Sequence, residues 1–254
     1  MIHLNFVREG QGPVVVLSHA LGCDLSMWDG VAPLLAQDFT VLRYDHRNHG
    51  RSEVAKGALS MQTLADDAAA LIEREAGGKP VHFVGLSMGG MTAQALAVSR
   101  PDLLASVVIA NSSSHYPDRA PWQARVNTVQ AQGVAAIASG AVARWLTPEF
   151  AATTEGAALA RKLNDTLVAT HAQGYIAACE GVAAIDFRES NRKIARPTLV
   201  IAGSRDEATP PAMSQEMAQA IPGAKLASIE AAHLSAVERP AEFVQLLKGF
   251  FQGL

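Results

Sequence analysis

The pentapeptide Gly-Leu-Ser-Met-Gly at residues 85–89 constrains the fold of this chain more than any other feature. It follows the apolar residues 81–84, a pattern typical of a buried strand, and precedes a stretch with helical character. A serine on such a strand-to-helix turn projects its hydroxyl from the end of a sheet. Gly85 and Gly89 lack the Cβ atoms that would collide where strand and helix cross. The sequence therefore predicts that Ser87 is a nucleophile beside the positive end of a helix.

Two further polar residues follow the serine, first an acid and then a histidine. The apolar residues 198–202 predict a buried strand, and Asp206 lies in the loop after it. Residues 226–230 predict another strand, and His233 follows its end. Because the carboxyl ends of parallel strands meet at one edge of a sheet, both side chains are expected beside Ser87. We interpret His233 as the general base and Asp206 as the residue that fixes its tautomer and stabilises the imidazolium.

Each of these residues also has a purely structural interpretation. Asp206 could cap a helix or turn ahead of Pro210, and His233 could be a satisfied polar residue of a loop. The other position for an acid is the end of the strand predicted over residues 106–110, where the sequence has Asn111. An amide carries no charge that could stabilise an imidazolium, so Asp206 is favoured as the acid.

Asp45, His46 and His49 lie close together within residues 44–52 and invite a metal-site interpretation. Neighbouring ligands on a tight turn rarely converge on one ion, and no nearby cysteine or helical histidine pair assists them. We therefore interpret this segment as a structural turn, and we predict that the protein uses no metal ion and no cofactor.

Taken together, these motifs resemble the α/β-hydrolase superfamily, and more closely the 3-oxoadipate enol-lactonases of bacterial aromatic degradation. The closer resemblance is carried by residues 85–91, 143–150, 174–180, 197–203, 206–211 and 231–235. It implies catalytic roles for Ser87, Asp206 and His233. It also implies that residues 45–52 form the family's Asp-x-Arg-Gly-x-Gly-x-Ser turn, in which Asn48 replaces a glycine. The turn should survive, because asparagine tolerates a left-handed backbone.

The turn at residues 18–22 follows a buried strand predicted over residues 14–17 and resembles the His-Gly-x oxyanion loop of hydrolases. The resemblance implies that the backbone N–H groups of Leu21 and Met88 together bind the oxyanion of a tetrahedral intermediate. The loss of one such donor typically costs about 3–4 kcal/mol of transition-state stabilisation. His19 is expected to brace this loop by hydrogen bonding.

The composition is that of a globular protein with a large core. Of the 254 residues, 49% are hydrophobic and 18% are charged, which excludes a disordered chain or one that wraps nucleic acid. The net charge of −3 gives no attraction to polyanions. The N-terminus lacks the pattern of a signal peptide, and no apolar run is long enough to cross a bilayer. With Cys23 and Cys179 as the only cysteines, we expect reduced thiols, a cytoplasmic location and neither nucleic-acid nor membrane partners.

The order of predicted elements divides the chain once. Residues 1–113 and 196–254 alternate strands and helices, which predicts a core with a mostly parallel sheet flanked by helices. The clearest elements of this core are a strand over residues 1–8 and helices over residues 61–75, 91–100 and 241–251. Residues 114–195 show no strand pattern; they contain alanine-rich amphipathic stretches at residues 122–132, 134–146, 156–172 and 175–185. A helical insert after the sixth strand is typical of a hydrolase with a cap, and we expect core and cap to form one catalytic unit.

Four residues of this cap, Trp122, Arg125, Arg144 and Trp145, are candidates for binding substrate. An enol-lactone carries a carboxylate that an arginine could bind bidentately, and aromatic rings could flank the lactone. The alternative is that the tryptophans pack in the core of the cap while the arginines are solvated. Residues 111–115 depart from the family pattern, which affects the expected substrate and not the reaction class.

The expected activity is hydrolysis of a small lactone, 3-oxoadipate enol-lactone to 3-oxoadipate, through an acyl-enzyme on Ser87. The alternative is a carboxylesterase for short-chain acyl esters, with perhydrolase side activity. A haloalkane dehalogenase is excluded, since it would have aspartate in place of Ser87. A lyase would use the same triad without an acyl-enzyme, and a small-molecule receptor would have a degenerate triad, which this sequence lacks. The expected partner is a small lactone or ester, and the sequence predicts no oligomeric state.

Overall fold

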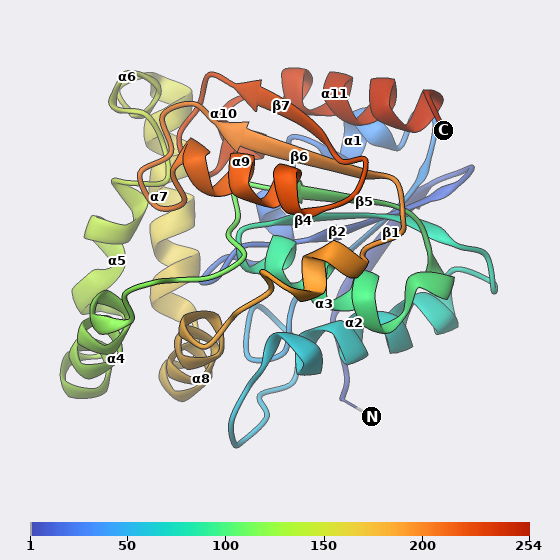
Figure 1. Cartoon of the computed structure of the whole chain (residues 1–254). Helices are drawn as coiled ribbons and strands as arrows, with labels where there is room; N and C mark the ends of the chain where they lie inside the picture. Colours follow the sequence, from blue (N-terminus) through green and yellow to red (C-terminus); the bar gives the residue numbers. More distant parts are fainter. Residues whose placement is uncertain (1) are drawn as a thin grey trace.

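The computed structural model describes residues 2–254, and its centre is a single sheet (Figure 1). Over these residues the sheet has seven strands in the order β1-β3-β2-β4-β5-β6-β7. The strands are β1 (Phe6–Gly10), β2 (Val14–Ser18), β3 (Thr40–Tyr44), β4 (Val81–Leu86), β5 (Leu104–Ala110), β6 (Thr198–Gly203) and β7 (Lys225–Ile229). β1 pairs antiparallel with β3, and all other neighbours are parallel. The predicted mostly parallel sheet is confirmed.

Helices cover both faces of this sheet, with α2 and α3 on one face and α1 and α11 on the other (Figure 1). The helices outside the insert are α1 (Ala32–Leu35), α2 (Met61–Glu75), α3 (Met88–Ser99), α9 (Pro211–Ala220), α10 (Ser235–Glu238) and α11 (Pro240–Gln252). The helix predicted over residues 61–75 is confirmed as α2. Ser60 caps its start by accepting a hydrogen bond from Thr63 N–H. No helix within residues 2–254 has the length and apolar character needed to span a bilayer.

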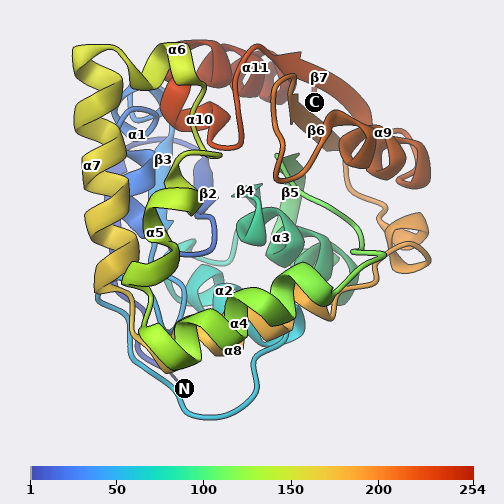
Figure 2. The ribbon, with the colours of Figure 1, turned by 90° about the vertical axis from the view of Figure 1, so that its left-hand side faces the viewer.

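Five helices form an insert between β5 and β6, and their ribbons border two sides of the strand ends in Figure 2. They are α4 (Ala120–Gln132), α5 (Ala135–Val142), α6 (Pro148–Ala151), α7 (Thr154–Ala169) and α8 (Ala172–Ala183). Each of the four predicted amphipathic stretches overlaps one of the helices α4, α5, α7 and α8, whereas the sequence pattern does not predict the short α6. The predicted position after the sixth strand is wrong. In the structure the insert follows the fifth strand, β5. The described residues that precede the insert form only the five strands β1 to β5, with the antiparallel β1 at the edge of the sheet.

The strand predicted over residues 1–8 is displaced in the structure. Met1 lies outside the described residues, and the strand covers Phe6–Gly10. Residues 2–5 have no strand structure, because their backbone groups hydrogen-bond to the turn at residues 45–53. An alternating apolar pattern does not show whether these backbone groups pair with a neighbouring strand or with a turn.

The carboxyl ends of four neighbouring strands bring the candidate residues to one edge of the sheet. Ser87 follows β4, Asn111 follows β5, Asp206 comes three residues after β6, and His233 comes four residues after β7. Since β4, β5, β6 and β7 are consecutive in the sheet, residues far apart in the sequence meet there.

Candidate active site

Ser87 occupies a strained turn between β4 and α3. Its φ of 57° and ψ of −115° place this non-glycine residue in a backbone region that side chains rarely adopt. A Cβ on Gly85 would lie 2.0 Å from the carbonyl oxygen of Gly89, and one on Gly89 would lie 2.0 Å from that of Ser18. Both glycines are therefore required where strand and helix meet. Gly89 also allows α3 to approach the end of β2 closely. This geometry is the sharp turn predicted from the sequence.

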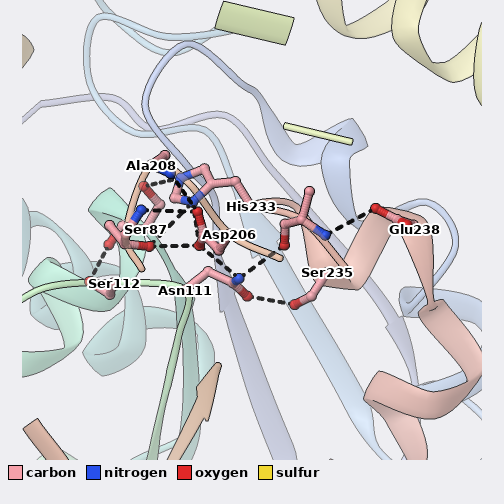
Figure 3. Close-up of polar contacts among 10 residues, drawn as sticks. Ser87, Asn111, Ser112, Asp206, Ala208, His233, Ser235 and Glu238 are labelled. Atoms are coloured by element: carbon pink, nitrogen blue, oxygen red, sulfur yellow. Dashed lines mark hydrogen bonds and ion pairs between the residues drawn. The ribbon is translucent and has the colours of Figure 1, made fainter. Parts of the chain in front are cut away.

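His233 joins Ser87 to Asp206 in a chain of hydrogen bonds (Figure 3). Its Nε2 lies 2.9 Å from Ser87 Oγ, and its Nδ1 lies 2.9 Å from Asp206 Oδ2. The ionised Asp206 can only accept, so the network assigns the ring proton to Nδ1. The unprotonated Nε2 then accepts from the Ser87 hydroxyl. This arrangement lets His233 take the serine proton when Ser87 attacks a carbonyl.

Asp206 is nearly fully buried and is surrounded by donors. Its Oδ1 accepts from the backbone N–H groups of Ala208 at 2.8 Å and Thr209 at 2.9 Å. Its Oδ2 accepts from Thr209 Oγ1 at 2.7 Å and from Asn111 Nδ2 at 3.0 Å. Burial alone would raise the pKa of Asp206, but the charge and hydrogen bond of His233 outweigh it, aided by Thr209 and Asn111. The pKa therefore lies below its usual range, and Asp206 is ionised at neutral pH.

Thr209 and Asn111 are the contacts of Asp206 that sequence reasoning missed. The spacing Asp-x-x-Thr was a readable signal for Thr209, since a side chain three residues later can close a turn around a carboxylate. From the sequence alone, Asn111 stands only at the alternative position for the acid, where its amide carries no charge. The structure places it at hydrogen-bond distance from Asp206 as a neutral donor, and it is fully buried.

The backbone N–H groups of Leu21 and Met88 lie on the two turns that meet beside Ser87. Met88 is the first residue of α3, so its N–H has no partner within the helix. Leu21 lines the same cavity as Ser87 and His233. A helix N-terminus and an adjacent turn are the usual source of the donors that bind an oxyanion.

His19 holds the loop that carries Leu21. Its Nδ1 lies 2.7 Å from the carbonyl oxygen of Ala20, and its Nε2 accepts from the backbone N–H of His46 at 3.0 Å. Burial lowers the pKa of His19, although the charge of Asp45 opposes this effect, so the ring is neutral with its proton on Nδ1. Because the Ala20 carbonyl and the Leu21 N–H belong to one peptide unit, fixing the first orients the second. The predicted bracing by hydrogen bonds is present in the structure.

The turn at residues 45–52 is built around the carboxylate of Asp45. That carboxylate accepts from the backbone N–H groups of Leu25 at 2.7 Å and Arg51 at 2.8 Å, and from Asn5 Nδ2 at 2.7 Å. Asn48 adopts the predicted left-handed conformation with a φ of 68°. Through these contacts Asp45 joins the turn to the segment that follows β2 and to the residues that precede β1.

A cavity of about 420 Å³ opens above Ser87 and His233. Trp122, Arg125, Arg144 and Trp145 all line it, so the structure brings the four predicted cap residues to the same space as the serine. The guanidinium of Arg125 lies 4.9 Å from the centre of the Trp122 ring. Neither arginine forms an ion pair with any carboxylate of residues 2–254. The same cavity is also lined by the acidic residues Asp118 and Glu207, and by Tyr116, Pro210 and Met213.

Comparison with known proteins identifies the family. Residues 13–240 match the family described as alpha/beta hydrolase fold. The chain belongs to the α/β-hydrolase family. It is 35% identical to 3-oxoadipate enol-lactonase 2 of Acinetobacter baylyi, over 95% of this chain and 90% of that protein.

Solved structures of α/β hydrolases agree with this assignment. The enol-lactonase from Burkholderia xenovorans LB400 superposes with a TM-score of 0.94 at 34% identity, over 99% of this chain and 97% of that one. A malate-bound thermophilic esterase from Thermogutta terrifontis superposes with a TM-score of 0.93 at 27% identity, over 99% and 94% of the two chains. This α/β hydrolase thus resembles both lactonases and esterases along its whole length.

Proposed function

We propose that this α/β hydrolase is a serine hydrolase that opens a small lactone, 3-oxoadipate enol-lactone to 3-oxoadipate, through an acyl-enzyme on Ser87. One observation carries the proposal: the hydrogen-bonded chain Ser87–His233–Asp206, with 2.9 Å at each link, lies under a cavity lined by two arginines that pair with no carboxylate of residues 2–254. The first feature supports acyl transfer, and the second supports a substrate with a free carboxylate.

The first half of the reaction would form the acyl-enzyme. Ser87 Oγ attacks the lactone carbonyl while its proton passes to His233 Nε2, and Asp206 stabilises the resulting imidazolium. The N–H groups of Leu21 and Met88 bind the oxyanion of the tetrahedral intermediate. Collapse of this intermediate breaks the bond between the carbonyl carbon and the ring oxygen. The ring oxygen leaves as an enol that takes the proton from His233 and rearranges to the ketone.

The second half would release the product. Water gives a proton to His233 Nε2 and attacks the ester carbonyl of the acyl-enzyme. Collapse of the second tetrahedral intermediate returns the proton to Ser87 Oγ and frees the carboxylic acid. No cofactor or metal takes part in the proposed steps.

Arg125 and Arg144 would bind the carboxylate that the lactone carries, with Trp122 and Trp145 flanking the ring. Arg125 is half-buried and held against Trp122, whereas Arg144 is exposed, so Arg125 can give the more desolvated contact. Asp118 and Glu207 on the same lining would disfavour an acid placed near them.

The cavity also supports our division of the chain. We propose that residues 114–195 are the cap and that residues 1–113 and 196–254 are the core, since the cavity is lined from both parts. The cap would exclude bulk water from the acyl-enzyme. A role in bacterial aromatic degradation follows from the resemblance to enol-lactonases, and a cytoplasmic location follows from the two cysteines expected to be reduced; both stay predictions. Cys23 and Cys179 are both free.

A carboxylesterase for short acyl esters, with perhydrolase side activity, is the second candidate. The apolar part of the cavity lining, which includes Leu21, Pro121, Trp145 and Met213, favours it, because a short acyl chain needs no charged partner. Pimeloyl-[acyl-carrier protein] methyl ester esterase of Aeromonas hydrophila, 27% identical over 96% of this chain, also supports it.

The discriminating experiment follows the ultraviolet loss of 3-oxoadipate enol-lactone with purified enzyme, with p-nitrophenyl butyrate in parallel. We expect a kcat/KM for the lactone that exceeds that of the ester by orders of magnitude. Turnover of the ester without the lactone would leave the hydrolase intact and overturn the lactonase assignment. Ser87→Ala is the control for uncatalysed hydrolysis in both assays.

A further inference from the structure

Asn111 lies at the centre of a buried hydrogen-bond network that joins the acid to the backbone beside the base (Figure 3). Its Nδ2 donates to Asp206 Oδ2 at 3.0 Å and to the carbonyl oxygen of Ala232 at 3.2 Å. Its Oδ1 accepts from Ser235 Oγ at 2.6 Å. Ala232 immediately precedes His233, so a single amide group contacts the loops that follow both β6 and β7.

The orientation of this amide is determined by its partners. The carboxylate of Asp206 and the carbonyl of Ala232 can only accept, so the NH₂ group must face them. The hydroxyl of Ser235 can then donate to Oδ1. Each amide hydrogen has one acceptor, and no donor of the side chain is left unpaired.

The backbone is shaped to place this side chain. Asn111 has a φ of 46°, in the left-handed region that asparagine tolerates better than most residues. Gly203, at the end of β6, leaves room for it, since a Cβ there would lie 2.6 Å from Asn111 Nδ2 and 2.4 Å from the Ala232 carbonyl oxygen. Asn111 is not part of the cavity lining, so it has no direct access to substrate.

We propose that Asn111 is a positioning residue. Its two amide hydrogens fix the Asp206 carboxylate relative to the backbone that carries His233. Its neutrality matters as much as its geometry. A carboxylate at this position would face two oxygen acceptors at hydrogen-bond distance, one of them charged. The inference rests on the proposed hydrolase mechanism and adds a residue to it.

The isosteric variant Asn111→Asp tests the charge. Two carboxylates about 3 Å apart share one proton, and a protonated Asp at position 111 can still donate to Asp206. As the pH rises, this proton is lost and the pair repels. We expect the kcat of this variant for p-nitrophenyl butyrate to fall on the alkaline side, by roughly 10–100-fold, where the wild type holds its plateau.

The variant Asn111→Gly tests the hydrogen bonds without adding charge, since glycine accepts the positive φ. We expect its kcat to fall by roughly 10–100-fold at all pH values while KM changes little, because Asn111 does not line the cavity. Asn191→Asp is the matched control. Asn191 is equally buried and donates to Gln94 Oε1 at 2.8 Å, outside the residues assigned to the reaction. Its replacement should lower stability and leave the shape of the pH profile unchanged.

The outcomes separate the positioning role from the proposed function. A wild type that hydrolyses the ester, together with Asn111 variants that have wild-type kcat and pH profiles, would overturn only the role of Asn111. The same alkaline loss in Asn191→Asp would also overturn it, because the effect would then be a general one of buried aspartate. A wild type that hydrolyses neither ester nor lactone would overturn the hydrolase mechanism and the positioning role with it.

Discussion

The carboxylate of Glu238 is joined to Thr147 by two hydrogen bonds, one from the backbone N–H at 3.0 Å and one from the hydroxyl. The same buried carboxylate accepts from the N–H of Ala232 at 3.2 Å (Figure 3), one residue before His233. Glu238 therefore links the insert segment that carries Trp145 to the loop that carries His233. Together with the hydrogen bond from the Leu234 N–H to the Trp145 carbonyl oxygen at 2.9 Å, this side chain holds one wall of the cavity beside the proposed general base.

Replacing Glu238 by glutamine should lower the free energy of unfolding by about 1–3 kcal/mol, because one amide group cannot accept from all three donors. Urea unfolding of the two proteins measures the difference. Glu149→Gln is the control: this glutamate also joins the insert to the core, through an exposed ion pair with Arg205, and its loss should lower the free energy of unfolding much less. Equal losses in both variants would show that the buried carboxylate has no special role.

Gly89→Ala should destabilise the protein by about 1–3 kcal/mol or more, because the added Cβ would meet the Ser18 carbonyl at 2.0 Å. It should also slow the reaction by displacing Ser87. Gly140→Ala provides the contrast, since that glycine lies in α5 with nothing within 4 Å of the added atom. Alanine there should stabilise the protein by roughly 0.5–1 kcal/mol. Thermal unfolding should therefore shift in opposite directions, and a shift in the same direction would contradict the packing described for the elbow.

Stability should fall in mild acid because His19, His46 and His49 are buried together, with ring centres 4.6–6.5 Å apart. Burial lowers the pKa of each, in the case of His49 to about 3. Between the ordinary histidine pKa of about 6.5 and these lowered values, the unfolded chain binds more protons than the folded one. Above about pH 6.5 the three histidines do not reduce the free energy of unfolding. Below it, the free energy of unfolding decreases as the pH falls, by up to about 1.4 kcal/mol per pH unit for each histidine.

Urea unfolding at pH 7 and pH 5 measures this slope. His49→Gln should reduce it by the contribution of about one proton, whereas replacement of the exposed His3 should leave it unchanged. A slope that is the same in wild type and His49→Gln would contradict the buried neutral state of that ring.

Arg125→Gln should raise the KM for the enol-lactone by roughly tenfold or more, the range expected when a charge-assisted hydrogen bond to a carboxylate is lost. The neutral ester p-nitrophenyl butyrate should keep its KM. Arg144→Gln should have a smaller effect on the lactone, because Arg144 is exposed, and Arg119→Gln, outside this cavity, should have none. An equal rise of KM for lactone and ester in Arg125→Gln would indicate a change of cavity shape and not the loss of a carboxylate contact.

The parts of the site that the sequence predicts are those encoded by short segments. Ser87 stands between a strand pattern and a helix, and Asp206 and His233 each follow a strand pattern within a few residues. The order of strands in a parallel sheet then brings them together, and the left-handed turn at Asn48 follows from its residue type. All of these features depend on local conformation and on the common rule that parallel strands end at one edge.

The parts that the sequence does not predict are contacts between distant segments. Asn111 and Asp206 are 95 residues apart, and Glu238 and Thr147 are 91 apart, so no local pattern relates them. The missed helix α6 has only four residues, too few for a period of 3.6 to show. The path of residues 2–5 depends on hydrogen bonds to a turn 40–50 residues away, which alternation of apolar residues cannot encode.

The most direct test of the central proposal is the mass of the protein after reaction with a fluorophosphonate, followed by peptide mapping. The mechanism predicts one adduct, on Ser87, whose rate of formation falls strongly in His233→Ala and which is absent in Ser87→Ala. No adduct in the wild type, or an adduct on another residue with Ser87 unmodified, would contradict the assignment of Ser87 as the nucleophile.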